Sequence, residues 1–261
     1  MRNNSLFKKY TVILGLIFIT SVSLHADNNL KPIWSLNDVS VNYFNWSQDT
    51  KSKTSQEDFS YFEYENCSGW SWGDFYMFSD LENHILNYNQ TSLNDLAFVI
   101  KPIADVKVHN NWYLHLQDYY WQSKAFYTND AVVGISYKYV SDFGLWIKPF
   151  LAEHYQNTSY FSGLNGYMAG WVFNYDMKIA GEKFSLFQWH EIEFDRIKRY
   201  YQLSDGTLIG DGKSSSVNGA ISLWWNIDKT FTTGVQYRYA ENKLGFEAYQ
   251  AGMIYSLKYY F

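Results

Sequence analysis

The sequence has little cysteine, proline or basic charge, and each shortage excludes a class of protein. Its one cysteine, Cys67, excludes an intramolecular disulfide framework and any cysteine-rich zinc site. With 3 Pro among 261 residues but 11 Trp, 24 Tyr and 19 Phe, the chain is unlike disordered segments, which are poor in aromatic residues. Its 26 Asp and Glu outnumber 21 Lys and Arg, which argues against a nucleic-acid-binding protein.

Long apolar runs are also missing, except close to the N-terminus. Residues 11–20 form a short apolar stretch that follows three basic residues, and residues 23–26 (Ser-Leu-His-Ala) resemble a cleavage site. A membrane-spanning helix needs about 20 apolar residues. We therefore interpret residues 1–26 as a signal peptide for export and residues 27–261 as the exported domain.

The exported part does contain a regular alternation of apolar and polar residues. In the C-terminal segment this period of two places an apolar and aromatic set on one face of a strand: Met253, Tyr255, Leu257, Tyr259 and Phe261. Similar segments predict twelve strands, at 39–46, 59–66, 70–79, 94–102, 111–120, 131–140, 145–154, 166–176, 183–195, 216–226, 230–240 and 247–261. The mean hydropathy of -0.34 would by itself indicate a soluble chain.

The connections between these strands alternate in length. Along the chain they have 12, 3, 14, 8, 10, 4, 11, 6, 20, 3 and 6 residues. Outer-membrane barrels have short periplasmic turns, longer external loops, an even number of strands and apolar residues facing lipid, with Trp and Tyr in girdles at both membrane edges. We predict an all-β protein, a transmembrane antiparallel β-barrel of 12 strands in the cell outer membrane. A soluble β-sandwich, whose apolar faces meet in a core that favours Val, Ile and Leu, is the alternative.

Residues 60–80 (SYFEYENCSGWSWGDFYMFSD) resemble a known family. They have Tyr-x-Glu-Tyr-Glu, then Trp-x-Asp-Phe-Tyr and a further Asp, as do the nucleoside-specific channel-forming proteins of Gram-negative outer membranes, the Tsx type. Weaker likenesses are Asn111-Trp112-Tyr113 and the aromatic last strand, whereas residues 67–70 replace a turn that is more often charged in the family. The resemblance implies a twelve-stranded, monomeric barrel whose narrow pore passes nucleosides and deoxynucleosides by facilitated diffusion, without a cofactor.

A pore that selects nucleosides needs flat aromatic walls for the base and hydrogen-bonding groups for the ribose hydroxyls. If Phe62 and Tyr64 face lipid, the alternation turns Tyr61, Glu63 and Glu65 into the lumen. On the next strand the same alternation turns Asp74 and Tyr76 inward. Basic partners are expected from across the pore, namely Lys138, Arg238 and Lys258. Charges of both signs would then create a transverse field in the lumen. The candidate pore-lining residues are Tyr61, Glu63, Glu65, Asp74, Tyr76, Tyr113, Arg238 and Lys258.

The segment 183–195 offers a rival cluster. If Ile192 and Phe194 face lipid, the residues that enter the lumen are Phe187, Trp189, Glu191 and Glu193. The same register turns Gln188 and His190 toward lipid, which predicts a β-bulge in this strand.

Other functions fit the pattern less well. A membrane-embedded enzyme needs a nucleophile beside a base, and no Ser and His occupy a strand rim in a way that suggests one. A narrow non-specific porin, or a phage or adhesion receptor that uses the loop 196–215, remains an alternative. General porins have 16–18 strands and are longer.

The sequence also bears on cofactors and partners. The histidines at positions 25, 84, 109, 115, 154 and 190 form no H-x-x-x-H pair, so their spacing predicts no metal site. We expect nucleosides as transported solutes, contact with outer-membrane lipid, and no nucleic acid.

Overall fold

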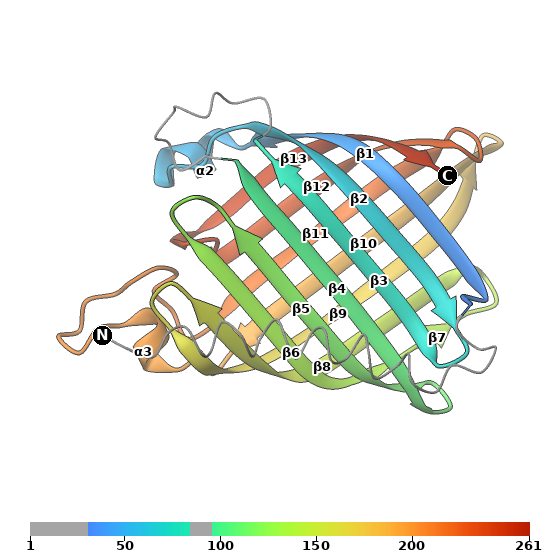
Figure 1. The fold of residues 1–261 in the computed structure, drawn as a ribbon. Coiled ribbons are helices and arrows are strands. Elements are labelled where there is room, and N and C mark those ends of the chain that lie inside the picture. The colour runs from blue at the N-terminus through green and yellow to red at the C-terminus, as the bar shows by residue number, and fades with distance from the viewer. Residues whose placement is uncertain (1–30, 84–95) are drawn as a thin grey trace.

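The computed structural model describes residues 31–83 and 96–261, and the predicted signal peptide lies outside them. Its strands are β1 (Trp34–Trp46), β2 (Phe59–Trp70), β3 (Gly73–Glu82), β4 (Ala97–His109), β5 (Trp112–Gln122), β6 (Tyr127–Tyr137), β7 (Tyr139–Val140), β8 (Leu145–Thr158), β9 (Ser162–Ile179), β10 (Glu182–Phe194), β11 (Ser216–Asn226), β12 (Phe231–Lys243) and β13 (Phe246–Tyr260). Each long strand pairs antiparallel with its neighbours, and the pairs β1–β13 and β6–β8 close the ring. Apart from the two-residue β7, this is the predicted twelve-stranded barrel (Figure 1).

The two ends of the barrel differ. One carries two-residue turns at 71–72, 110–111 and 180–181, and the C-terminus lies at this end (Figure 1). The other carries two short helices, α2 (Gln48–Lys53) after β1 and α3 (Lys198–Tyr201) after β10. By the usual arrangement of outer-membrane barrels, the short-turn end faces the periplasm.

Several strands are longer than predicted, so several connections are shorter. β2 continues through the region around Cys67 that the sequence suggested as a turn, and the actual turn is 71–72. β4 continues past Pro102 to His109, because this proline lies where the pairing of β4 with β5 skips two residues and no backbone N–H is needed. The expected long connections before β6 and β9 shrink to 123–126 and 159–161.

The predicted strand 131–140 is interrupted. β6 ends at Tyr137, Lys138 donates its backbone N–H to Asn111, and the two-residue β7 then pairs with β8. The break lies opposite Pro149 of β8. On one side of this proline Ile147 pairs with β7, and on the other side Phe150 pairs with the end of β6. Since proline cannot donate to a ladder, the interruption has a local cause.

The predicted bulge in β10 is wrong. This strand pairs with β9 and with β11 without a register shift. Gln188 and His190 do face outward, but each has a polar partner there. Gln188 accepts from Trp171 Nε1 at 3.3 Å, and His190 Nδ1 lies 2.7 Å from the Tyr239 hydroxyl. Each side chain thus has a hydrogen-bond partner on the outward face, so no bulge is required to turn it inward.

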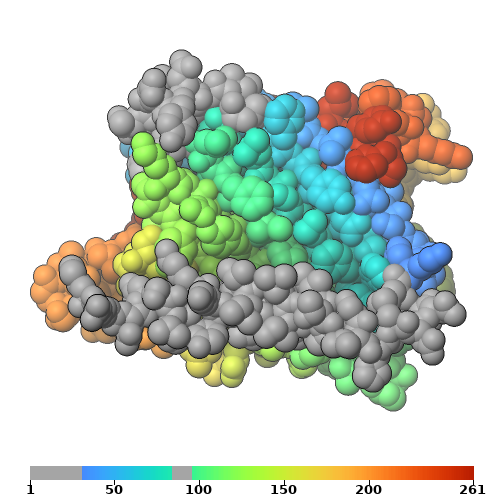
Figure 2. All heavy atoms as spheres, in the orientation of Figure 1, coloured from blue at the N-terminus to red at the C-terminus, as the bar shows by residue number. Residues whose placement is uncertain are grey.

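The outward face is apolar, with aromatic residues toward both ends. Exposed aromatic residues near the short-turn end are Trp34, Trp112, Tyr139, Phe143, Trp225, Phe231, Tyr259 and Phe261, and those toward the other end include Tyr43, Tyr155, Tyr160, Tyr167, Tyr237 and Tyr249. Aliphatic residues such as Val41, Ile135 and Leu223 are exposed between them. Figure 2 shows part of this wall, over the N-terminal strands, as a continuous surface of side chains. Such girdles are typical of membrane barrels.

Among the residues that the structure describes, no helix is long and apolar enough to cross a membrane.

Candidate functional site: the lumen of the barrel

All eight candidate residues lie on the inward face of the barrel. On β2, Tyr61, Glu63 and Glu65 pair with Asn42, Ser40 and Asp38 of β1, whose buried side chains alternate with exposed Val39, Val41 and Tyr43. The same alternation turns Asp74 and Tyr76 of β3, Tyr113 of β5, Arg238 of β12 and Lys258 of β13 inward. The structure divides them among separate groups.

The first group surrounds Lys258. Its ammonium contacts the Glu65 carboxylate and lies 3.6 Å from Asp38 Oδ1 and 3.9 Å from Glu63 Oε1. The Tyr76 hydroxyl donates to the other Glu65 oxygen at 2.5 Å. Lys258 does not act from across the pore as expected, because β13 is separated from β2 by β1 alone. Three carboxylates therefore share one ammonium on a single wall.

An aromatic group stands beside these carboxylates, toward the α2 end. Phe44 and Trp46 of β1 stack with ring centroids 4.0 Å apart, Phe59 lies 5.4 Å from Phe44, and Tyr61 lies 5.8 Å from Phe59. Phe44, Trp46 and Tyr61 are buried together with Ile254. We did not predict Phe44 and Trp46 as lining residues, although the alternation along β1 places them on the same face as Asn42.

The second charged group lies near the short-turn end. Asp74 pairs with Lys138 at 2.9 Å, and Lys148 contacts the Asp105 carboxylate. Asp105 also accepts from Ser136 Oγ at 2.6 Å and lies 2.9 Å from His115 Nδ1. Tyr113 is inward on the neighbouring β5, with its side chain buried. Lys138 is thus a partner of Asp74, as the sequence suggested.

The third group spans the lumen. Lys101 of β4 and Glu191 of β10 form an ion pair at 2.5 Å, and Gln117 of β5 donates to the same Glu191 oxygen at 2.9 Å. The Trp189 ring lies 5.3 Å from Lys101 Nζ and 4.7 Å from Arg238 Cζ. Arg238 therefore joins the rival cluster of β10 rather than the β2–β3 wall. Lys101 was not predicted as a lining residue. The alternation along one strand does not tell which residues of the opposite wall its side chains meet.

A fourth group lies toward the α3 end of the lumen. Lys243 contacts the Glu193 carboxylate and lies 3.4 Å from Asp130 Oδ2. Arg196, the second residue after β10, donates to Glu193 at 2.7 Å from Nε and 2.5 Å from Nη2, and lies 3.4 Å from Asp211 Oδ2. Burial raises the pKa of the Asp211 carboxyl, although Arg196 beside it acts in the opposite direction. The loop 195–215 is thus anchored in the lumen rather than lying wholly on the surface.

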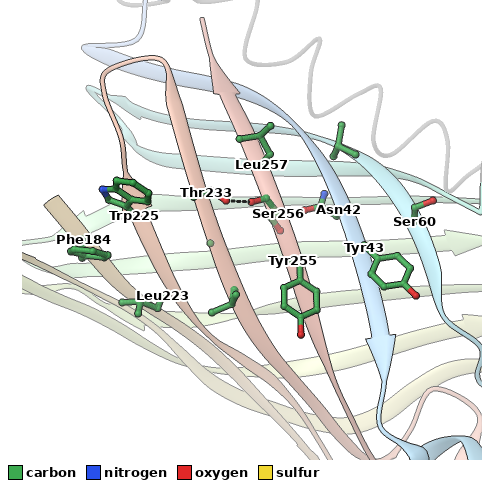
Figure 3. A pocket seen from close by; sticks show the side chains of 13 residues that line it. Asn42, Tyr43, Ser60, Phe184, Leu223, Trp225, Thr233, Tyr255, Ser256 and Leu257 are labelled. Atoms are coloured by element: carbon green, nitrogen blue, oxygen red, sulfur yellow. Dashed lines mark hydrogen bonds between the residues drawn. The ribbon is translucent and has the colours of Figure 1, made fainter. Parts of the chain in front are cut away.

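A separate hollow lies on the outer wall. Its labelled side chains include Phe184, Trp225, Leu223, Tyr43 and Tyr255 (Figure 3). These residues alternate with the lumen-facing ones, so the hollow faces lipid and takes no part in the lumen.

The sequence pattern of one protein family matches residues 41–261, and the family is described as nucleoside-specific channel-forming protein, Tsx. The chain belongs to this family. Membership in the Tsx family agrees with the resemblance in residues 60–80. It also agrees with the closed antiparallel barrel, a fold typical of outer-membrane proteins.

Two porins are among the solved structures that the chain resembles. The NanC porin is 12% identical, with a TM-score of 0.50, over 85% of this chain and 98% of the porin. The KdgM porin is 10% identical, with a TM-score of 0.47, over 86% and 99% of the two chains. At such identities the NanC likeness concerns the fold alone. This member of the Tsx family is an outer-membrane β-barrel channel.

Proposed function

We propose that the channel passes nucleosides and deoxynucleosides by facilitated diffusion. The observation that carries the proposal is the position of Tyr61 on β2. Its ring closes the aromatic group of Phe44, Trp46 and Phe59, and Glu63 is the next inward residue on the same strand. A base on the rings would therefore place its sugar near carboxylate acceptors.

The expected energies suit transport. Stacking of a base on an aromatic side chain contributes about 1–3 kcal/mol, and millimolar affinity corresponds to about -4 kcal/mol. A single platform with a few hydrogen bonds reaches that range. Conduction requires binding that is weak enough to allow release.

The charges of the lumen favour an uncharged polar solute. Lys258 faces Glu65, Lys101 faces Glu191, and Lys138 faces Asp74, so both signs lie close together along the lumen. An ion of either sign would meet a like charge in each group. A nucleoside carries hydroxyls that can both donate to the carboxylates and accept from the ammonium groups.

The test is the block of small-ion current in planar bilayers that contain the refolded protein. Adenosine and thymidine are expected to reduce the current in a saturable way, whereas free ribose and maltose leave it unchanged. Tyr61→Leu should weaken the block by about tenfold, as loss of one stacking ring implies. Phe62→Leu is the matched control, because this neighbouring aromatic residue faces outward and is 47% exposed.

Two outcomes would contradict the proposal. Equal block by all four solutes would indicate a narrow non-specific porin. No block by any of them would leave a barrel of this shape with another role, such as a surface receptor.

A further inference from the structure

Three ionisable side chains from three strands converge in the fourth group of the lumen. Asp130 of β6, His154 of β8 and Glu193 of β10 are 3%, 0% and 2% exposed. One nitrogen or oxygen atom from each lies within 4.8 Å of those from the other two. An imidazole with two carboxylates is a donor set that suits divalent transition metals, Zn²⁺ among them.

His154 supplies a second, independent observation. Neither of its ring nitrogens has a hydrogen-bond partner, and Asp130 Oδ1 lies 3.5 Å from Nε2. Polar groups in protein interiors are bonded as a rule, and leaving one unpaired costs about 1–3 kcal/mol. Its cross-strand partner Val132 belongs to a small apolar cluster with Ala152 and Met168. A fully buried imidazole whose two nitrogens lack hydrogen-bond partners, beside two carboxylates, is arranged as a ligand.

The charged side chains around His154 carry an excess of negative charge. Asp130, Glu193 and Asp211 face Lys243 and Arg196, so the carboxylates exceed the cations by one. A divalent ion in place of the Lys243 ammonium would make the group neutral.

The backbone at Lys243 allows this exchange. Lys243 ends β12 at a register shift, and its neighbours Asn242 and Leu244 have φ of 51° and 61°. Its long side chain starts from an irregular end of a strand, at the turn 244–245. Asp130 and Glu193 instead lie within regular ladders, and His154 pairs regularly with Val132 of β6, although β8 shifts register against β9 at this residue. The Lys243 ammonium, at the end of a long flexible side chain, is therefore the member of the group that can move away most easily.

We propose that Asp130, His154 and Glu193 form a binding site for one divalent transition-metal ion, which exchanges with the Lys243 ammonium. Small rotations of the carboxylates would bring the three ligand atoms to coordination distances of about 2.0–2.2 Å. The spacing of histidines gives no sign of the site, because each ligand comes from a different strand.

The test is a Co²⁺ titration of the refolded, chelator-treated protein in detergent, followed by visible absorption and by equilibrium dialysis. One Co²⁺ per chain is expected to bind, with absorption bands of a nitrogen and oxygen ligand set, and Zn²⁺ should displace it. His154→Gln and Asp130→Asn should weaken binding by about tenfold or more, a loss of about 1.4 kcal/mol or more. Lys243→Met, which removes the competing ammonium, should strengthen it by a similar factor. His109→Gln, which removes an exposed imidazole at the end of β4, is the control and should change nothing.

The results overturn the proposal in defined ways. Absence of one-to-one binding to the unaltered protein overturns it whatever the variants do, so the test does not depend on their folding. Binding that survives His154→Gln but is lost in His109→Gln places the metal on the surface. Binding that Lys243→Met leaves unchanged rules out the exchange.

Discussion

Lys101 and Glu191 join two walls of the barrel, with Nζ and Oε1 2.5 Å apart. Between β4 and β10 the ring contains β5, β6, β8 and β9 on one side and six strands on the other. Gln117 reinforces the tie from β5. The pair crosses the lumen, so it limits the lumen's width as well as its charge.

Breaking this pair should change both stability and ion selectivity. Lys101→Met leaves the Glu191 carboxylate buried without its counter-charge, and such a loss costs about 3–5 kcal/mol. We expect a lower urea midpoint for unfolding and a stronger preference for cations, measured as the reversal potential in a salt gradient.

The double variant Lys101→Met/Glu191→Gln separates the two effects. It is expected to regain most of the stability, because no buried charge is left unpaired, and to conduct more ions than the unaltered channel. Lys183→Met, at the exposed start of β10, removes the same charge as a control. Unchanged selectivity in Lys101→Met would contradict the cross-lumen role.

Trp189 should contribute to nucleoside binding if the proposed function holds. Lys101 and Arg238 both lie near its ring, so a base that stacks there would also meet donors for its ring oxygens and nitrogens. Trp189→Leu is expected to raise the nucleoside concentration needed for half-block by about tenfold. Trp225→Leu on the outward face of β11 should have no such effect. Equal changes in both variants would indicate a general loss of barrel integrity.

Arg196 should hold the loop 195–215 in place. Besides Glu193, its guanidinium donates to Ser216 Oγ at 2.7 Å and to the Asn242 carbonyl at 3.0 Å. Arg196→Gln removes a buried charge from this network, at a cost of about 3–5 kcal/mol. We expect faster chymotrypsin cleavage within the loop while the barrel stays resistant. Arg199→Gln, which loses an exposed bond to the Ser162 carbonyl, is the comparison; similar cleavage rates in both would argue against an anchoring role for Arg196.

Gly134 should be required for the seam between β6 and β8. A Cβ at this position would lie 2.1 Å from the Leu151 carbonyl oxygen and 2.4 Å from Ala152 Cα, so the backbone itself would have to move. Overpacking of this kind costs about 1–3 kcal/mol, and Gly134→Ala should lower the urea midpoint. Val133→Ala on the same strand, whose side chain is 54% exposed, should have a smaller effect. A midpoint for Gly134→Ala equal to that of the unaltered protein would show that the seam can relax.

The alternation in the sequence predicted the faces of the strands well and their ends poorly. Period-two patterning decides which residues face the lumen, so Tyr61, Glu63 and Glu191 were placed correctly. Strand ends extend beyond the membrane, where polar residues occupy both faces, so the patterning there is weak. Pro102 and Pro149 lie at gaps in a ladder that only the paired strands define, and these gaps adjoin two of the places where the predicted strands and the structure differ.

Contacts across the lumen could not be predicted in the same way. Which inward residues meet depends on the stagger of all twelve strands, accumulated around the ring. Lys101 with Glu191, and Lys243 with Glu193, are therefore consequences of closure rather than of any local pattern. Groups within one wall, such as Glu63 and Glu65 with their neighbours, are formed by adjacent strands. Such groups could therefore be predicted from the sequence.

The pairing of β1 with β13 has a consequence for how the protein reaches its membrane. Asp38 pairs with Tyr260 and Trp46 with Gly252, so the ring closes only when its first strand meets its last. Until then β1 has an unpaired edge that can add a strand from another chain. All twelve strands of the ring must therefore be in place before it can close, and its unfinished edges need protection until then.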